Sequence, residues 1–140
     1  MLLNFDKLNG LLPAVVQDQA TGKVLMVGYM NAEALEKTLQ TGQVTFFSRS
    51  RNRLWVKGES SGHLLRLHDV LVDCDEDALV VVAEQLGPGT CHRGYRSCFY
   101  RRVQDGKLAE AEARAFDPEK VYGSPSGATA AKAAEKEAGR

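Results

Sequence analysis

The sequence has no excess of either charge, no long apolar run and few cysteines, and each shortage excludes a class of protein. Its 18 basic and 18 acidic side chains give a formal net charge of zero, which argues against a nucleic-acid-binding protein. No apolar run approaches the roughly 18 residues that span a membrane, and the N-terminus does not resemble a signal peptide. We therefore expect a cytoplasmic protein with no membrane contact. In that compartment the three cysteines are expected to be thiols or metal ligands rather than disulfides.

The composition is that of one globular domain. The chain has 140 residues, of which 44% are hydrophobic and 26% charged, and this length suffices to bury a core. We predict an α+β fold: a mixed, strand-dominated single domain with short helices over residues 1–118, followed by a partly disordered C-terminal extension, residues 119–140. Apolar and alternating segments predict strands at Leu12–Asp18, Lys23–Met30, Val44–Ser48, Leu54–Lys57, Leu64–Val72, Leu79–Val82 and Ser97–Val103.

Helices are expected in three places. Asn31 is a suitable N-cap and Gly42 a suitable C-terminal stop for a helix over Ala32–Thr41. Residues 105–116 are rich in Ala and Glu, which predicts a second helix. Asp117-Pro118 then offers an N-cap and a first helical position. From Gly123 onward there is almost nothing to bury, so we expect a disordered or frayed tail. The strand Leu79–Val82 is continuously apolar, which is typical of burial on both faces.

The segment DCDED, Asp73 to Asp77, puts four acids around one cysteine, directly before an apolar run. In an extended segment successive side chains point to opposite faces, so Asp73, Asp75 and Asp77 would share one face and Cys74 would lie on the other. Carboxylates suit Mg²⁺ or Ca²⁺, whereas thiolates suit zinc. The pattern therefore predicts two metal sites that share one strand.

The sequence offers the Cys74 thiol two partners, Cys91 and Cys98, in the segment CHRGYRSC. Three thiolates make a zinc site with an open fourth position, as in catalytic zinc sites. Zinc lowers the pKa of water bound at such a position toward ~7. His92 could be a fourth ligand, which would close the site, or a base beside the bound water. The sequence leaves both roles of His92 open.

Simpler interpretations compete with these metal sites. Free cysteines are most often small buried hydrophobic residues, and acidic clusters are usually solvated loops. An EF-hand calcium loop nearly fits the D-x-D-x-D pattern followed by Glu84. It fails at its sixth position, where Ala78 replaces the glycine needed for the sharp turn. The valines after Ala78 also favour a strand where that loop must curl.

A basic stretch, SRSRNRLWVKGESSG, runs from Ser48 to Gly62. Arg holds phosphate with a bidentate fork and Lys holds it as a point charge, so this stretch suits a small phosphorylated ligand. The alternative is a solvated hairpin with exposed cations, in which Trp55 belongs to the core. Its cations lie at odd positions, namely Arg49, Arg51, Arg53 and Lys57.

Five segments occur in order along the chain: YMN at Tyr29 to Asn31, SRSR at Ser48 to Arg51, LWVKGESSG at Leu54 to Gly62, DCDEDAL at Asp73 to Leu79 and CHRGYRSCFYR at Cys91 to Arg101. Together they closely resemble the phosphoribosyl-AMP cyclohydrolase family of histidine biosynthesis. The resemblance covers roughly residues 12–101.

This resemblance implies a hydrolase that opens the adenine ring of 1-(5-phosphoribosyl)-AMP at its N1–C6 bond. It also implies one zinc ion per active site, magnesium, and an intertwined homodimer whose protomers share the zinc ligands at the subunit interface. The family's zinc ligands match Cys74, Cys91 and Cys98, and its magnesium ligands match Asp73, Asp75 and Asp77.

The resemblance also implies the course of the reaction. Zinc-activated hydroxide attacks C6 of the purine, as in zinc deaminases that act on adenine, and N1 is the leaving group. We predict that His92 handles the proton near that water and that magnesium orients a phosphate or hydroxyl of the substrate. The segment GPGTCH is one residue longer than the family's commonest form, and Arg93 replaces a frequent small hydroxyl residue. The expected substrate contacts are Arg49, Arg51, Lys57, Ser60 and Ser61.

Two other functions fit parts of the sequence. A noncatalytic zinc module would need a fourth protein ligand, most plausibly His92, and would not need the three aspartates. A nucleotide deaminase would share the zinc chemistry, but its H-x-E and P-C-x-x-C pattern is absent because Cys91 and Cys98 are seven positions apart. Ammonia release would favour the deaminase, and ring opening without ammonia would favour the cyclohydrolase.

Overall fold

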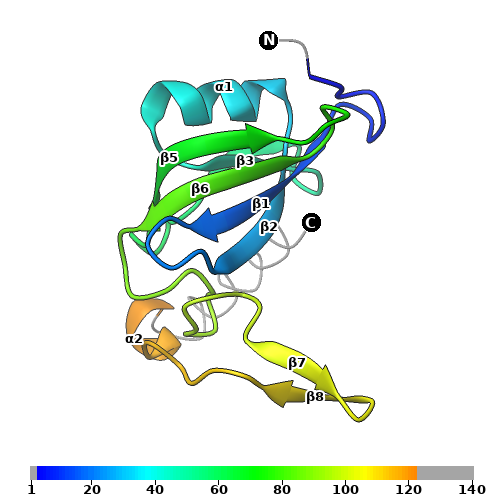
Figure 1. Cartoon of the computed structure of the whole chain (residues 1–140). Helices are drawn as coiled ribbons and strands as arrows, with labels where there is room; N and C mark the ends of the chain where they lie inside the picture. The colour runs from blue at the N-terminus through cyan, green and yellow to red at the C-terminus, as the bar shows by residue number, and fades with distance from the viewer. Residues whose placement is uncertain (1–2, 123–140) are drawn as a thin grey trace.

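A four-stranded sheet with strand order β2-β1-β6-β5 forms the centre of the structure (Figure 1). The computed structural model describes residues 3–122. In the main sheet β1 and β6 are parallel, and the other neighbours are antiparallel. The hairpins β3–β4 and β7–β8 form separate two-stranded sheets. The elements are β1 (Leu12–Asp18), β2 (Val24–Met30), α1 (Ala32–Thr41), β3 (Thr45–Ser48), β4 (Arg53–Val56), β5 (Leu65–Val72), β6 (Leu79–Gln85), β7 (Arg101–Gln104), β8 (Lys107–Glu110) and α2 (Pro118–Tyr122).

The alternation of side chains along the strands determines which face of the main sheet is buried. Every second residue of β1, from Leu12 to Asp18, is buried. In β6 the residues Leu79, Val81 and Ala83 are buried, whereas Val80 and Val82 are only half-buried. The expectation that this strand is buried on both faces is therefore wrong. One face of the main sheet packs into the core, to which α1 and β3 also contribute. The other face is more exposed to solvent.

Helix α1 begins and ends where its capping residues predict. The Asn31 side chain accepts a hydrogen bond from the backbone N–H of Ala34 at 2.8 Å. Gly42 has φ 72°, the left-handed conformation of a helix C-cap, and its N–H donates to the Thr38 carbonyl. Thr38 is fully buried, and its hydroxyl accepts from the N–H of Thr45 at 3.0 Å. This bond fixes the start of β3 against the helix.

The segment after residue 100 differs from the prediction. The strand predicted at Ser97–Val103 is confined to β7, and the helix predicted at residues 105–116 is absent because β8 forms there. Asp105 and Gly106 have φ values of 50° and 73°, so they make the two-residue turn of a hairpin. The Asp-Gly turn thus outweighs the helix propensity of the Ala and Glu residues that follow it.

The structure confirms the predicted helix start at Pro118, which opens α2. The Asp117 carboxylate accepts a hydrogen bond from the N–H of Glu119 at 3.0 Å, as an N-cap does. The predicted disorder from Gly123 falls outside the described residues. Neither helix in the described range has the length and hydropathy needed for a membrane crossing.

Candidate metal and substrate site

Residues 73–78, here called the acidic turn, connect β5 to β6 and belong to neither strand. The prediction that they are extended, with side chains on alternate faces, is therefore wrong. Glu76 is left-handed, with φ 65°. The Asp73 carboxylate accepts hydrogen bonds from the N–H groups of Asp77 at 3.0 Å and Ala78 at 3.2 Å. The chain turns here because an Asp side chain can satisfy the backbone groups of a turn.

The acidic turn nevertheless brings the predicted carboxylates together. Oxygens of Asp73, Asp75 and Asp77 lie within 4.8 Å of one another. The Lys7 ammonium lies 3.3 Å from Asp75 Oδ2 and 2.5 Å from Asp77 Oδ2. Its hydrogen bond to Asp77 raises the pKa of Lys7, and its hydrogen bond to Asp75 lowers the pKa of Asp75. The turn thus holds a positive charge already, and its three oxygen donors fit a hard divalent cation.

Cys91 and Cys98 lie together in the cysteine loop, residues 87–98, which follows β6. The Cys91 N–H donates to the Tyr95 carbonyl at 3.1 Å, and the Cys98 N–H donates to the Leu25 carbonyl at 2.8 Å. Cys91 is 5% exposed. The pKa of Cys91 is lowered to about 6, mainly because the Cys98 thiol donates a hydrogen bond to it. The pair therefore favours the thiolate form, which is the metal-binding form of cysteine.

Cys74 lies apart from this pair within one chain. It is exposed in the acidic turn, and its thiol donates to Asp75 Oδ1 at 3.6 Å. Cys74 precedes β6 and Cys91 follows it, so the two residues lie beyond opposite ends of a seven-residue strand (Figure 1). Such a strand spans roughly 20 Å. A single chain therefore does not bring the three sulfurs to one ion.

Lys57 lies beside the cysteine pair and not beside the arginines of the basic stretch. Its side chain is buried, and burial lowers the pKa of Lys57, while the charges of Cys98 and Cys91 act in the opposite direction. Its ammonium lies 5.5 Å from the Trp55 ring centroid. Trp55 itself is part of the core, as expected. A buried cation beside two thiols compensates negative charge that would otherwise be unpaired.

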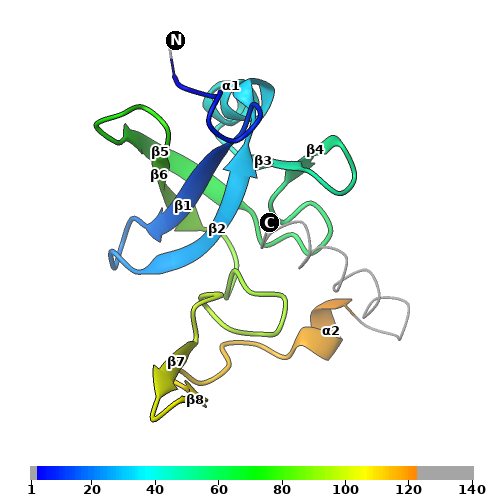
Figure 2. The same cartoon turned by 90° about the vertical axis from the view of Figure 1, so that its right-hand side faces the viewer.

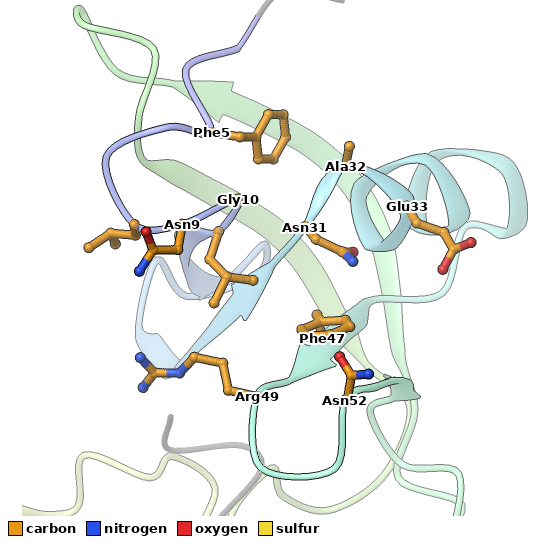
Figure 3. A pocket seen from close by; sticks show the side chains of 11 residues that line it. Phe5, Asn9, Gly10, Asn31, Ala32, Glu33, Phe47, Arg49 and Asn52 are labelled. Atoms are coloured by element: carbon orange, nitrogen blue, oxygen red, sulfur yellow. The ribbon is translucent and has the colours of Figure 1, made fainter.

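Arg49 lines a groove of about 840 Å³ that the sequence did not predict (Figure 3). The groove lies between the N-terminal loop, residues 5–11, the start of α1 with its N-cap Asn31, and the β3–β4 hairpin, which contributes Phe47. The Arg49 guanidinium lies 4.5 Å from the Tyr29 ring centroid. Arg51 is exposed in the hairpin turn. Lys57 follows β4, at the other end of this hairpin. The expected cationic contacts of the substrate therefore lie in two places: Arg49 and Arg51 at the hairpin turn, and Lys57 beside the cysteines.

The loop of residues 58–63 carries the remaining predicted substrate contacts. Ser60 is exposed, and the half-buried Ser61 accepts a hydrogen bond from the N–H of His63 at 3.1 Å. Burial, and then the charge of Lys57, lowers the pKa of His63. His92 is half-buried next to Cys91 in sequence. His63 was not predicted, although its position directly after the ESSG segment could have indicated it.

These features define an α+β protein with two sets of candidate metal ligands, a thiol pair and a carboxylate cluster. The sequence model of the family "Phosphoribosyl-AMP cyclohydrolase" matches residues 26–100. A phosphoribosyl-AMP cyclohydrolase of Desulfotalea psychrophila is 56% identical over 87% of this chain and 97% of its own length. One of Solibacter usitatus is 55% identical over 90% of this chain and 100% of its own length.

A third relative of the same name, from Methanothermobacter thermautotrophicus, is 57% identical over 88% of this chain and 92% of its own length. The chain belongs to the phosphoribosyl-AMP cyclohydrolase family. The matched residues 26–100 include all three cysteines, the acidic turn and His92.

Proposed function

We propose that the chain is a phosphoribosyl-AMP cyclohydrolase of histidine biosynthesis, which opens the adenine ring of 1-(5-phosphoribosyl)-AMP. Water adds to C6 of the base, the C6–N1 bond breaks, and N1 takes up a proton. The observation that carries this proposal is the family match over residues 26–100, because that segment contains every candidate metal ligand. The lowered pKa of Cys91, to about 6, adds independent support for a metal-binding thiol pair.

Cys91 and Cys98, together with Cys74 of a second chain, would hold zinc. The donor set fits this ion, since thiolates are soft ligands that suit zinc, and three of them leave one position for water. Zinc, when bound, would lower the pKa of that water toward ~7. Lys57 would offset part of the negative charge of the thiolates. His92, adjacent to Cys91, would accept or donate the proton that moves during the reaction.

The positions of the cysteines support a homodimer with shared zinc ligands, because a single chain leaves Cys74 far from the pair. Three exposed apolar side chains support an interface: Phe99 is 54% exposed, Val103 78% and Leu108 62%. Val103 and Leu108 belong to the β7–β8 hairpin, which lies away from the main sheet in both views (Figures 1 and 2). A projecting apolar hairpin is suited to packing on a second subunit, as an intertwined dimer requires.

Asp73, Asp75 and Asp77 would hold magnesium after it displaces the Lys7 ammonium from the same oxygens. Their oxygens are hard ligands of the kind that Mg²⁺ prefers. Arg49 and Arg51, both exposed, would bind the phosphates of the substrate, and Ser60 and Ser61 would also contact the substrate. Lys57 would meet the part of the substrate that lies nearest the thiols.

The direct test is incubation of the purified protein with 1-(5-phosphoribosyl)-AMP while the absorbance of the ring-opened product is followed. We expect ring opening without ammonia, and we expect a zinc chelator to abolish it. Release of ammonia would identify a deaminase instead. Full zinc occupancy with no reaction would favour a noncatalytic zinc protein.

A further inference from the structure

Residues 114–122, here called the strap, lie outside the segment that the family model matches, yet they pack on the cysteine loop. The N–H groups of Ala115 and Phe116 both donate to the Gly94 carbonyl, at 2.7 and 3.1 Å. The Arg114 guanidinium lies 5.8 Å from the Tyr95 ring centroid. The strap is therefore bonded to the turn that carries Cys91, although it is distant in sequence.

Two glycines show how closely the strap approaches. A Cβ atom on Gly94 would lie 2.5 Å from the Phe116 carbonyl oxygen and 3.0 Å from Pro118 Cδ. A Cβ atom on Gly89 would lie 2.9 Å from Phe116 Cε1. Real Cβ contacts at such distances force atoms apart, and Gly94 also has φ 97°, so only glycine fits there without strain. The cysteine loop thus has a surface shaped to the strap.

Phe116 also joins the cysteine loop to the loop of residues 58–63. Its ring meets the His63 ring edge to face, with centroids 4.9 Å apart and an interplanar angle of 89°. The His63 ring also approaches Gly87, where a Cβ atom would lie 2.7 Å from His63 Cδ2. His63 donates a hydrogen bond to the Gly89 carbonyl. Phe116 therefore packs on a histidine that contacts both Gly87 and Gly89, in the segment before Cys91.

The strap ends at Tyr122, whose half-buried phenol lies near the candidate zinc ligands. Tyr122 is electrostatically coupled to both Cys91 and Cys98, and burial raises its pKa. The Tyr122 phenol shares a hydrogen bond with the Ser61 hydroxyl, which acts to lower the pKa of Tyr122. Ser61 itself accepts from the His63 N–H at 3.1 Å. Tyr122 is thus bonded to Ser61, which is itself an expected substrate contact.

We propose that the strap is part of the active site: Phe116 is a positioning residue that holds the cysteine loop, and Tyr122 forms a hydrogen bond with the phosphorylated nucleotide substrate beside Cys91 and Cys98. This inference rests on the proposed function for the identity of the ligand. It adds the nine residues 114–122 to the site, from a region that no motif of the sequence indicates.

The first test is Tyr122→Phe in the full-length, zinc-loaded protein, with Lys120→Ala as the matched control on the same helix. Loss of one hydrogen bond to the substrate should raise KM roughly tenfold, while zinc content and melting temperature stay at the wild-type level. Lys120, which is exposed, should tolerate the change. An unchanged KM in Tyr122→Phe, with wild-type protein active, would refute the substrate contact.

The second test does not depend on turnover. In metal-free protein, Phe116→Ala should speed the labelling of Cys91 by iodoacetamide several-fold, because the strap no longer holds the loop. Phe116→Tyr keeps the ring and should label at the wild-type rate. Equal labelling in Phe116→Ala and wild type would overturn the positioning role. If wild-type protein opens no ring, the proposed function fails, and this labelling still decides whether the strap holds the loop.

Discussion

The acidic turn and the cysteine loop both carry candidate metal ligands, but they are built in opposite ways. The acidic turn is exposed and held by hydrogen bonds of its own residues, such as those to the Asp73 carboxylate. The cysteine loop has a buried Cys91 and is held by distant partners, including the carbonyls of Val24 and Leu25. A solvated turn can adapt to a hydrated ion, whereas a buried loop fixes its ligands before the metal arrives.

This contrast predicts that changes in the cysteine loop have larger effects than changes at the exposed cations. Cys91→Ser should lower kcat/KM by roughly a thousandfold, because a lost thiolate removes the metal that activates water. Activity assays and zinc analysis after gel filtration measure both quantities. Arg96→Ala, an exposed change between the two cysteines, is the control and should keep its zinc. Full zinc content and activity in Cys91→Ser would contradict the assignment.

His92→Ala should have the next largest effect. Loss of a residue that transfers a proton lowers kcat by about 10²- to 10⁴-fold, while zinc content should remain at the wild-type value. The pH dependence of kcat should lose the limb that belongs to the histidine. If zinc is lost together with activity, His92 is a ligand, and the site is closed as in a noncatalytic zinc protein. Unchanged turnover would exclude both roles.

The exposed arginines should affect binding more than chemistry. Arg49→Gln and Arg51→Gln should each raise KM about five- to tenfold, which corresponds to one charge-assisted hydrogen bond to phosphate. Their kcat values should change little. Arg66→Gln is the matched control, since Arg66 is exposed on β5 and pairs with Glu84 at 3.4 Å. If all three variants have the same KM, Arg49 and Arg51 do not bind the substrate.

Lys7→Met should have the smallest effect, and in the opposite direction. Lys7 competes with a metal ion for the Asp75 and Asp77 carboxylates, so its removal should tighten Mg²⁺ binding a few-fold in a calorimetric titration. The melting temperature should stay close to that of the wild type, as is usual when an exposed ion pair is lost. Lys37→Met, on the exposed face of α1, is the control. Weaker Mg²⁺ binding in Lys7→Met would contradict competition.

Elements with strong local signals were predictable from the sequence. Helix α1 has the predicted bounds, Ala32–Thr41, because Asn31 and Gly42 act as caps within the same segment. The helix predicted at residues 105–116 shows the limit of composition, since the single turn Asp105-Gly106 determines a hairpin there. In both segments the residues that form caps or turns predict the structure better than the overall composition does.

Contacts between distant residues were not predictable. The three aspartates do converge, but through a turn and not through strand alternation. Nothing near the acidic turn in sequence indicates Lys7, which lies 68 positions before Asp75. The same holds for Phe116, whose partner His63 belongs to another loop. Such pairs form only after the sheet has brought the loops together, so they leave no periodic signal in the sequence.

The central claim is that two chains complete one zinc site, and subunit mixing tests it most directly. Cys74→Ser and Cys91→Ser should each be inactive alone. In a mixed dimer one site would combine the intact Cys91–Cys98 pair of one chain with the intact Cys74 of the other. After unfolding and refolding an equal mixture, half of the dimers are mixed, so roughly a quarter of wild-type activity and zinc should return. An inactive mixture that contains mixed dimers would contradict the shared site.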